Sequence, residues 1–335
     1  MKVMAGDIGG TKTLLQIADY QQGDKKGQVI FEQRYESARY SDFTTMLKEF
    51  IQAAGWAAGR HINAACFGVA GPVEQNPSGQ SVKVTNLPWQ LDTKTLGVEL
   101  GFDKILLIND FQAVGYGIEA LAREDLVDLQ DRPPVPQAPR LVVGAGTGLG
   151  IALLVSRPGG YDVLPSEGGH AGFAPSDTLQ VALLEYLIKR FGRAGYEKIL
   201  CGPGLVNIYE FLRTRSRVAN DALPQRLVQN NDLPTAITTL ALSGMDKTAQ
   251  VAVDLFIAIY GGYAGNLALV TLPYGGVYIA GGIAPKLIER INAGGLIRAF
   301  INKGAMSHLL EKMPVRVVMN PKVGLMGAAL AAARL

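Results

Sequence analysis

Lys2-Val-Met-Ala-Gly-Asp-Ile-Gly-Gly-Thr-Lys-Thr-Leu-Leu-Gln-Ile-Ala18 opens the chain, and this stretch decides the fold. Its apolar ends, Lys2–Ala5 and Thr13–Ala18, are typical of strands, and the glycine-rich turn Gly6–Lys12 joins them. The same order of strand, glycine turn and strand recurs at Arg140–Val143, Gly144–Gly150 and Ile151–Val155. We therefore predict an α/β protein with an internal repeat.

Periodic patterns of apolar residues predict the other strands and helices. Further strands are expected at Val29–Tyr35, Ala64–Val69, Lys104–Ile108, Gly276–Ala280 and Val315–Met319. Helices are expected at 43–51, after a cap at Ser41, and at 111–121, 179–191, 249–269 and 323–333. The last of these could pack back across the N-terminal domain.

A proline-rich connector separates the two halves of the repeat. Asp131–Pro139 contains four prolines and cannot continue a helix or a central strand. We expect two domains: residues 1–110 with about 316–335 form a smaller α/β domain, and residues 111–315 form a larger one.

Composition excludes several classes of function. Only 18% of the 335 residues are charged, the net charge is +3, and the basic residues form no stripe, so no nucleic-acid partner is expected. Two cysteines, Cys66 and Cys201, exclude a disulfide framework and a cysteine-rich zinc site, which favours a reducing cytoplasm. Asp7 interrupts the opening apolar residues before the apolar region of a signal peptide could form.

One long uncharged stretch resembles a membrane span. No charged residue occurs from Leu255 to Pro285, and Gly261 and Gly265 form a GxxxG pattern. However, Thr271-Leu-Pro-Tyr-Gly-Gly276 breaks the stretch, and a spanning helix needs about 20 unbroken apolar residues. We expect a buried helix, a turn and a buried strand, and no membrane association.

The two glycine turns are candidates for binding phosphate. Consecutive glycines can direct several backbone N–H groups into one concavity, and they let an anion approach the backbone closely. Thr11 and Thr147 each add a hydroxyl donor, and Asp7 is placed to hold hydrated Mg²⁺. The alternative is that both are ordinary hairpin turns, which glycine also favours. A third glycine cluster around the strand Gly276–Ala280 favours the phosphate interpretation.

Asn109 and Asp110 end an apolar strand, where α/β sheets commonly place ligands. Asp110 has two interpretations: it caps the helix that follows, or it acts as a general base. The amide of Asn109 can both donate to and accept from a sugar hydroxyl.

Glu167-Gly-Gly-His170 places a carboxylate and an imidazole within one short segment. The glycines between them cannot fill a core, which favours a tight loop that presents both groups to a ligand. A structural histidine remains the alternative, and a metal site is disfavoured because no third ligand is near in sequence. Glu197 is either a further ligand or a solvated helix residue.

Together these motifs are similar to those of the bacterial glucokinase family, in the branch without zinc. The resemblance covers nearly the whole chain, and its motifs occur in the family's order. They are Gly6–Thr11, Thr85-Asn-Leu-Pro-Trp89, Ile108-Asn-Asp-Phe111, Gly144–Gly150, Glu167–His170, Leu200-Cys-Gly-Pro-Gly-Leu-Val-Asn207 and Gly275-Gly-Val-Tyr-Ile-Ala-Gly-Gly-Ile283.

The resemblance implies a fold, a reaction and a set of site residues. The fold is that of actin, hexokinase and Hsp70, with two ribonuclease-H-like α/β domains flanking an active-site cleft. The reaction is transfer of the ATP γ-phosphoryl group to the 6-hydroxyl of glucose, assisted by Mg²⁺, in a protein that is commonly a homodimer. Asp110 resembles the catalytic base. The implied sugar ligands are Asn86, Asn109, Asp110, Glu167, His170 and Glu197. The implied nucleotide-binding residues are Gly6, Asp7, Ile8, Gly9, Gly10, Thr11, Gly146, Thr147, Gly148, Gly281 and Gly282.

Alternatives to a glucokinase are a kinase of the same fold for mannose, fructose or an N-acetyl hexosamine, and a non-kinase ATPase of that fold. The related repressor/open-reading-frame/kinase family has a cysteine-ligated zinc, but the matching cysteines are absent from this chain. The chain also lacks an N-terminal helix-turn-helix, which argues against a sugar-sensing repressor. Lys12 departs from the family pattern, since several relatives have a polar amide at that position.

Overall fold

The computed structural model describes residues 1–55, 61–77, 79–102, 104–215 and 232–335, which divide into two units. Unit 1 comprises Met1–Asp125, Arg157–Pro165 and Asn320–Leu335, and unit 2 comprises Leu126–Ser156 and Ser166–Met319. These bounds differ from the predicted domains, 1–110 with about 316–335 and 111–315. The segment after residue 110 groups with unit 1 because its helix packs there, and Gln112 Nε2 donates to the Val163 carbonyl at 2.8 Å.

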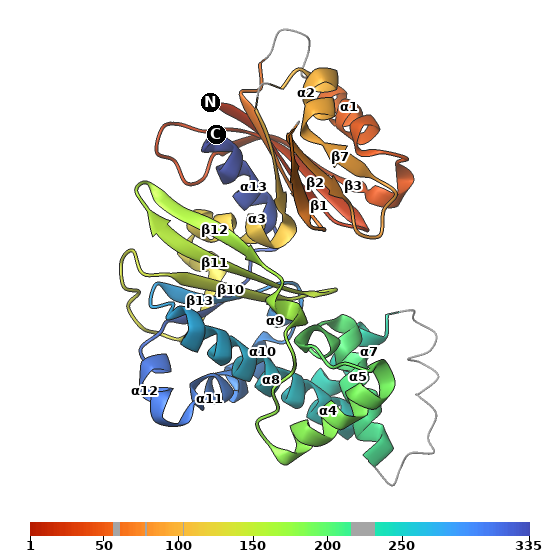
Figure 1. The fold of residues 1–335 in the computed structure, drawn as a ribbon, viewed down its shortest axis with the longest axis vertical. Coiled ribbons are helices and arrows are strands. Elements are labelled where there is room, and N and C mark those ends of the chain that lie inside the picture. Colours follow the sequence, from red (N-terminus) through yellow and green to blue (C-terminus); the bar gives the residue numbers. More distant parts are fainter. Residues whose placement is uncertain (56–60, 78, 103, 216–231) are drawn as a thin grey trace. The chain divides into compact units, whose positions relative to one another are not determined.

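Unit 1 is built on a five-stranded sheet with the strand order β3-β2-β1-β4-β8 (Figure 1). Its strands are β1 (Lys2–Ile8), β2 (Lys12–Asp19), β3 (Gln28–Glu36), β4 (Ala64–Val69) and β8 (Ile105–Asn109). The first three strands are antiparallel, whereas β4 and β8 run parallel to β1. A smaller sheet is formed by β5 (Val73–Asn76), β6 (Gly79–Lys83) and β7 (Gln90–Asp92).

Helices cover both faces of the larger sheet in unit 1 (Figure 1). Side chains alternate along β1, so that Met4 and Ile8 join one core cluster with α1 (Phe43–Ala53) and α2 (Thr93–Leu100). Val3 and Ala5 point the other way, into a cluster with α3 (Asp110–Gly117) and the C-terminal helix α13 (Val323–Ala333). Both faces of this sheet are therefore buried.

Glycines allow α3 and α13 to pack closely. A Cβ atom placed at Gly117 would lie 2.0 Å from the Val323 carbonyl oxygen. One at Gly327 would lie 1.8 Å from the Ala113 carbonyl oxygen. No larger side chain fits at either position without moving a backbone, so the two helices meet through backbone contact.

The glycine turns are shorter than the sequence predicts. Gly6, Asp7 and Ile8 belong to β1, where they pair with both β2 and β4, and only residues 9–11 form the turn. In unit 2 the strands β10 (Arg140–Ala145) and β11 (Leu149–Arg157) leave only residues 146–148 in the turn. Gly6 is required by packing, because a Cβ atom there would lie 2.8 Å from a ring carbon of Phe67. The predicted turn bounds of Gly6–Lys12 and Gly144–Gly150 were wrong for this reason.

Two predicted helix bounds also change. Helix α1 is capped by Asp42 instead of Ser41, because the Asp42 carboxylate accepts the Thr45 amide at 2.8 Å. The helix predicted at 111–121 is α3, which ends at Gly117 and continues as the 3-10 turn Ile118–Ala120.

A six-stranded sheet has the order β12-β11-β10-β13-β14-β9, and its strands from β11 to β9 belong almost entirely to unit 2. Its other strands are β13 (Gly276–Ala280), β14 (Val315–Val318), β9 (Leu126–Gln130) and β12 (Gly160–Ser166), of which residues 160–165 are grouped with unit 1. As in unit 1, the central strand β10 pairs antiparallel with the next strand, β11, and parallel with β13, which pairs parallel with β14. The first five positions repeat the arrangement of unit 1, which confirms the predicted internal repeat.

Helix α8 (Lys247–Thr271) forms the centre of the helical part of unit 2 and packs most extensively on α11 (Gly295–Ile301) (Figure 1). The other helices in the described residues of unit 2 are α4 (Thr178–Phe191), α5 (Gly202–Arg215), α7 (Leu233–Leu242), α9 (Ile283–Lys286), α10 (Ile288–Asn292) and α12 (Ser307–Leu310). The glycines of the GxxxG pattern face α11. Cβ atoms at Gly261 and Gly265 would lie 2.0 and 2.4 Å from the carbonyl oxygens of Leu296 and Phe300.

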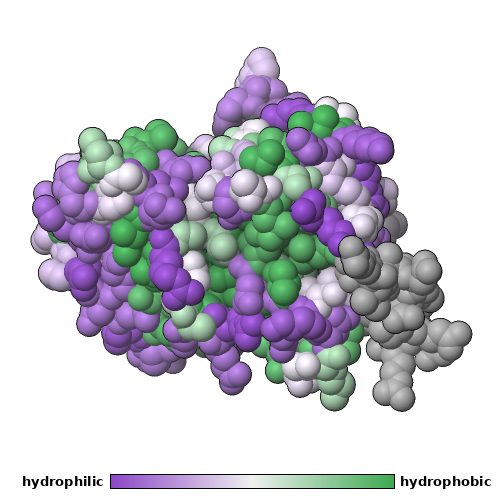
Figure 2. All heavy atoms as spheres, turned by 90° about the horizontal axis from the view of Figure 1, so that it is seen from below, coloured by the Kyte–Doolittle hydropathy of each residue, from purple (hydrophilic) through white to green (hydrophobic). Residues whose placement is uncertain are grey.

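Among the described residues, α8 is the one helix long and apolar enough to cross a membrane by length and composition. In its most apolar window, however, 61% of the residues are buried inside the protein. Figure 2 shows hydrophilic residues over much of the face that it draws, with the hydrophobic residues gathered in patches between them. We therefore interpret α8 as the core helix of unit 2, as the sequence predicts.

Candidate active site

Two carboxylates meet at the end of the sheet in unit 1. Asp7, near the end of β1, is in register with Gly68 of β4, and Gly68 is in register with Ile108 of β8. Asp110 begins α3 directly after β8. A Cβ atom at Gly68 would lie 3.8 Å from the Asp110 Cα and 2.8 Å from the Ala113 Cβ, so this glycine lets α3 start close above the sheet.

The pKa of Asp7 is changed by this arrangement. Burial, and second the charge of Asp110, raise the pKa of Asp7 from 3.8 to about 6. On another side of the carboxylate lies α13, where a Cβ atom at Gly324 would be 3.2 Å from Asp7 Oδ2. Asp7 is therefore held in a narrow space beside a second acid, a setting that a bound cation would stabilise.

Asn109 is the N-cap of α3, so the interpretation of Asp110 as the cap is wrong. The Asn109 Oδ1 atom accepts the Phe111 amide at 2.9 Å, and its Nδ2 donates to the Gly71 carbonyl at 3.3 Å. Asp110 lies in the first turn of the helix, where its Oδ1 also accepts the Phe111 amide at 2.8 Å. An acidic side chain in the first turn of a helix interacts favourably with the helix dipole.

Two buried hydroxyl groups fix the turn at residues 9–11. The Ser37 hydroxyl donates to the Gly9 carbonyl at 2.8 Å and lies 3.0 Å from the Thr13 hydroxyl. The Ser37 amide donates to the Thr11 carbonyl at 3.0 Å. These contacts leave the Thr11 side chain exposed. The roles of Ser37 and Thr13 are not predictable from the sequence, because a buried serine some 25 residues after the turn carries no local signal.

Asn86 lies beside the same turn. A Cβ atom at Gly10 would be 3.4 Å from the Asn86 Cβ and 3.2 Å from the Thr85 carbonyl oxygen. Asn86 has a φ of 63°, in the left-handed region that asparagine tolerates better than most residues. Its exposed side chain thus shares one end of unit 1 with the turn, Asp7, Asn109 and Asp110.

In unit 2, the turn at residues 146–148 is tied to the segment from Glu197 to Gly202. The Gly146 amide donates to the Gly148 carbonyl, and the Gly202 amide donates to the Gly146 carbonyl, both at 2.9 Å. Glu197 Oε2 accepts the Leu149 amide at 3.0 Å. The Glu197 carboxylate is therefore fixed at the edge of this turn, which argues against a solvated helix residue.

Glu167, His170 and Glu197 are brought together in unit 2. His170 Nε2 lies 3.9 Å from a Glu167 oxygen, and His170 Nδ1 lies 4.0 Å from Glu197 Oε1. Their side chains remain 78%, 60% and 33% exposed in that order along the chain, so the cluster is open to a ligand. The backbone beneath is tightly packed, since a Cβ atom at Gly169 would lie 2.2 Å from the Leu149 carbonyl oxygen.

Gly281 and Gly282 follow β13 at the same end of the sheet as the turn. Gly281 has a φ of +84°, and a Cβ atom there would lie 2.3 Å from the Ala145 carbonyl oxygen, at the end of β10. Gly282 has open space where a side chain would be. Thr147 is exposed beside them on the turn. Unit 2 thus gathers the predicted nucleotide-binding glycines and the acid–histidine cluster at one edge.

Chemically, each unit presents part of what phosphoryl transfer requires. Unit 1 offers paired carboxylates, amides and a glycine turn, and unit 2 offers a second glycine turn and a cluster of hydroxyl-binding groups. Where the structure is described, no three histidine, cysteine or carboxylate side chains are grouped to hold a metal ion.

Comparison with known proteins identifies the family. The model of the glucokinase family matches residues 4–335. The chain belongs to the glucokinase family. A glucokinase of Nostoc punctiforme is 44% identical over 347 residues, which cover 99% of each chain. The crystal structure of a glucokinase from an Antarctic psychrotroph covers all of this chain and 99% of its own, with a TM-score of 0.85 and 26% identity. At 18% identity and a TM-score of 0.65, a ROK family glucokinase from Streptomyces griseus shares the fold.

Membership of the glucokinase family confirms three predictions from the sequence. The resemblance itself, the two-part α/β fold of the hexokinase type and the enzyme class are all borne out. The chain is a kinase of this family, and ATP is the phosphoryl donor that the family implies.

Proposed function

We propose that the chain transfers the γ-phosphoryl group of ATP to the 6-hydroxyl of D-glucose, with Asp110 as the general base. The family supports the reaction, and the pairing of Asp7 with Asp110 across Gly68 carries the assignment of roles. Two neighbouring carboxylates in an active site commonly have different roles, because their environments differ. Here Asp7 is assigned to the phosphates and Asp110 to the sugar.

Asp110 has the position and the chemistry of a base. A sugar hydroxyl is a weak nucleophile, so a carboxylate that orients it and accepts its proton lowers the barrier to attack. Asp110 lies in the first turn of α3, while burial and the charge of Asp110 raise the pKa of Asp7 to about 6. Asn109 and Asn86 supply amides for the neighbouring hydroxyls.

The phosphates of ATP are assigned to the two glycine turns. Residues 9–11 and 146–148 supply backbone N–H groups, with the hydroxyls of Thr11 and Thr147, and Gly281–Gly282 lie on the adenosine side. Asp7 fits Mg²⁺, because its carboxylate is confined beside a second negative charge and hard oxygen donors suit this cation. When bound, Mg²⁺ supplies charge neutralisation at the transferring phosphoryl group.

Glu167, His170 and Glu197 are assigned to glucose. Each can accept a hydrogen bond, and together they offer acceptors to several adjacent hydroxyls, which is what a pyranose with equatorial hydroxyls needs. A hexose with one inverted hydroxyl would leave an acceptor in this cluster without its partner, so it should bind more weakly.

A coupled assay with a panel of hexoses tests the function. With ATP and Mg²⁺ we expect phosphorylation of glucose with a much higher kcat/KM than of fructose, galactose, mannose or an N-acetyl hexosamine. A preference for one of the other hexoses would assign a different substrate to the same fold. ATP turnover that is independent of any sugar would overturn the kinase assignment.

Asp110→Asn tests the base. The variant keeps the shape of the side chain but cannot accept the proton, so kcat should fall by roughly 10²- to 10⁴-fold while glucose still binds. Glucose binding is measured by calorimetry. A variant that keeps most of its kcat would show that Asp110 is not the base.

We also place the chain in glycolysis in the cytoplasm, as a homodimer. Cys66 and Cys201 are both buried and unpaired with each other, which suits a reducing compartment. Sedimentation analysis tests the oligomeric state, and a monomer at micromolar concentration would contradict a stable homodimer.

A further inference from the structure

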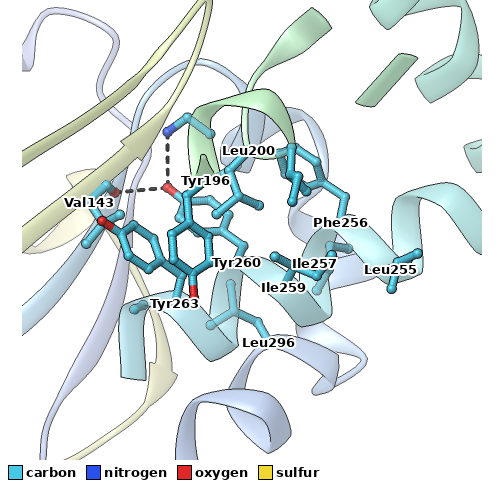
Figure 3. Packing of buried hydrophobic residues seen from close by; sticks show 14 of the residues in the cluster. Val143, Tyr196, Leu200, Leu255, Phe256, Ile257, Ile259, Tyr260, Tyr263 and Leu296 are labelled. Carbon is cyan, nitrogen blue, oxygen red and sulfur yellow. Dashed lines mark hydrogen bonds between the residues drawn. The ribbon is translucent and has the colours of Figure 1, made fainter. Parts of the chain in front are cut away.

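Two tyrosines one turn apart on α8 reach the backbone segments that carry the assigned site residues. The Tyr260 hydroxyl accepts the Ala145 amide at 3.1 Å and donates to the Val143 carbonyl at 2.9 Å (Figure 3). It also lies 3.4 Å from the Ala280 carbonyl oxygen. Ala145 and Ala280 directly precede Gly146 and Gly281, so Tyr260 joins the two strand ends from which the nucleotide-binding glycines project.

Tyr263 makes the corresponding contact to the sugar cluster. Its hydroxyl donates to the Gly168 carbonyl at 2.7 Å, inside the segment that joins Glu167 to His170. Its ring stacks on Tyr196, with centroids 3.8 Å apart, and Tyr196 directly precedes Glu197 (Figure 3). Through these two contacts, the Tyr263 side chain fixes the backbone segments that carry all three assigned sugar ligands.

Packing alone does not require these hydroxyl groups. Tyr260 and Tyr263 are 1% and 3% exposed, and phenylalanine would fill the same space. A buried hydroxyl is unfavourable unless it is hydrogen-bonded, and both hydroxyls bond to backbone at the site segments. Burial raises the pKa of both groups well above the usual value, so each remains a neutral donor and takes no part in proton transfer.

We propose that α8 positions the two substrates separately: Tyr263 positions the glucose ligands, and Tyr260 positions the strand ends that hold the ATP phosphates. Both are positioning residues, and the inference rests on the proposed function. Because each hydroxyl bonds to a different segment, loss of one should affect one substrate and spare the other.

The test is a crossed pair of substitutions, each of which removes one oxygen atom. In Tyr263→Phe we expect the KM for glucose to rise about fivefold or more, and the KM for ATP to stay within about twofold. In Tyr260→Phe we expect the opposite pattern. Tyr209→Phe is the matched control, because its hydroxyl bonds to Asp246 at the start of α8 and should change neither KM.

The outcomes separate the inference from the function. Wild-type protein that does not phosphorylate glucose overturns the proposed function. An active wild type with variants that change both KM values equally, or neither, overturns the inference. If Tyr260→Phe does not fold, Tyr263→Phe still decides, and calorimetric titration with glucose then provides a readout that does not depend on turnover.

Discussion

Substituting Asp7 with asparagine should make the protein more stable at neutral pH while removing its activity. The pKa of Asp7 is raised from 3.8 to about 6, chiefly by burial and second by Asp110. A change of this size corresponds to about 3 kcal/mol of unfavourable free energy for the ionised carboxylate. Since the residue is partly exposed, we expect Asp7→Asn to gain about 1–2 kcal/mol at pH 8.

The pH dependence has a defined sign. The folded-state pKa of Asp7 lies above the unfolded value, so the folded protein binds more protons between about pH 4 and 6. The destabilisation is absent below this window, grows as the pH rises through it and is complete above it. The stability gained by Asp7→Asn should therefore be smaller at pH 5 than at pH 8.

Urea unfolding of wild type and variant at pH 5 and pH 8 measures this difference. Asp42→Asn is the control, because a hydrogen bond from the Thr45 amide lowers the pKa of Asp42. The stability from the Asp42 carboxylate is present above its unfolded pKa and lost as the pH falls, so removing that charge gives no gain at pH 8. An Asp7→Asn variant less stable than wild type at pH 8, or equally changed at both pH values, would refute the reasoning.

Two further substitutions separate binding from stability. In His170→Ala the KM for glucose should rise, while the melting temperature and the KM for ATP should stay unchanged because the His170 side chain is largely exposed. His308→Ala is the control. A large loss of stability in His170→Ala would indicate a structural histidine. In Gly148→Ala the added Cβ would lie 2.8 Å from Glu197 Oε2, so the flexible carboxylate must move and glucose binding should weaken with little change in stability. Gly262→Ala, where a Cβ meets nothing within 4 Å, should leave the KM unchanged; equal KM values in both glycine variants would contradict the role of Glu197.

Periodic patterns predicted the architecture, since they are local. The alternation in residues 2–18 and its repeat near residue 140 are consequences of strands packed on two faces, and the structure confirms both. The ends of the strands were predicted less well, because glycine has two meanings. At Gly9 it forms the turn, whereas at Gly6 it makes room for Phe67 inside the sheet. Sequence alone does not distinguish these cases.

Contacts between distant segments explain what the sequence could not show. Asp7 depends on Gly68 and Gly324, and the turn at residues 9–11 depends on Ser37, yet none of these small residues stands out locally. The candidate site residues were found because carboxylates, amides and imidazole beside glycines are uncommon. The residues that hold them in place were not predicted, because serine, glycine and tyrosine occur in many structural contexts and carry no local signal of this role.

Because α13 covers one face of the sheet in unit 1, that face cannot be buried until α13 has been synthesised. Val3, Ala5, Ala64 and Cys66 are covered by α13, which is synthesised much later, so this face of the sheet stays exposed to water while the intervening chain is made. At about 5–20 residues per second, synthesis of residues 67–323 takes roughly 13 to 51 seconds. During that time this face of the sheet is an exposed apolar surface that a chaperone can bind, and nearly all of unit 2 is synthesised before α13.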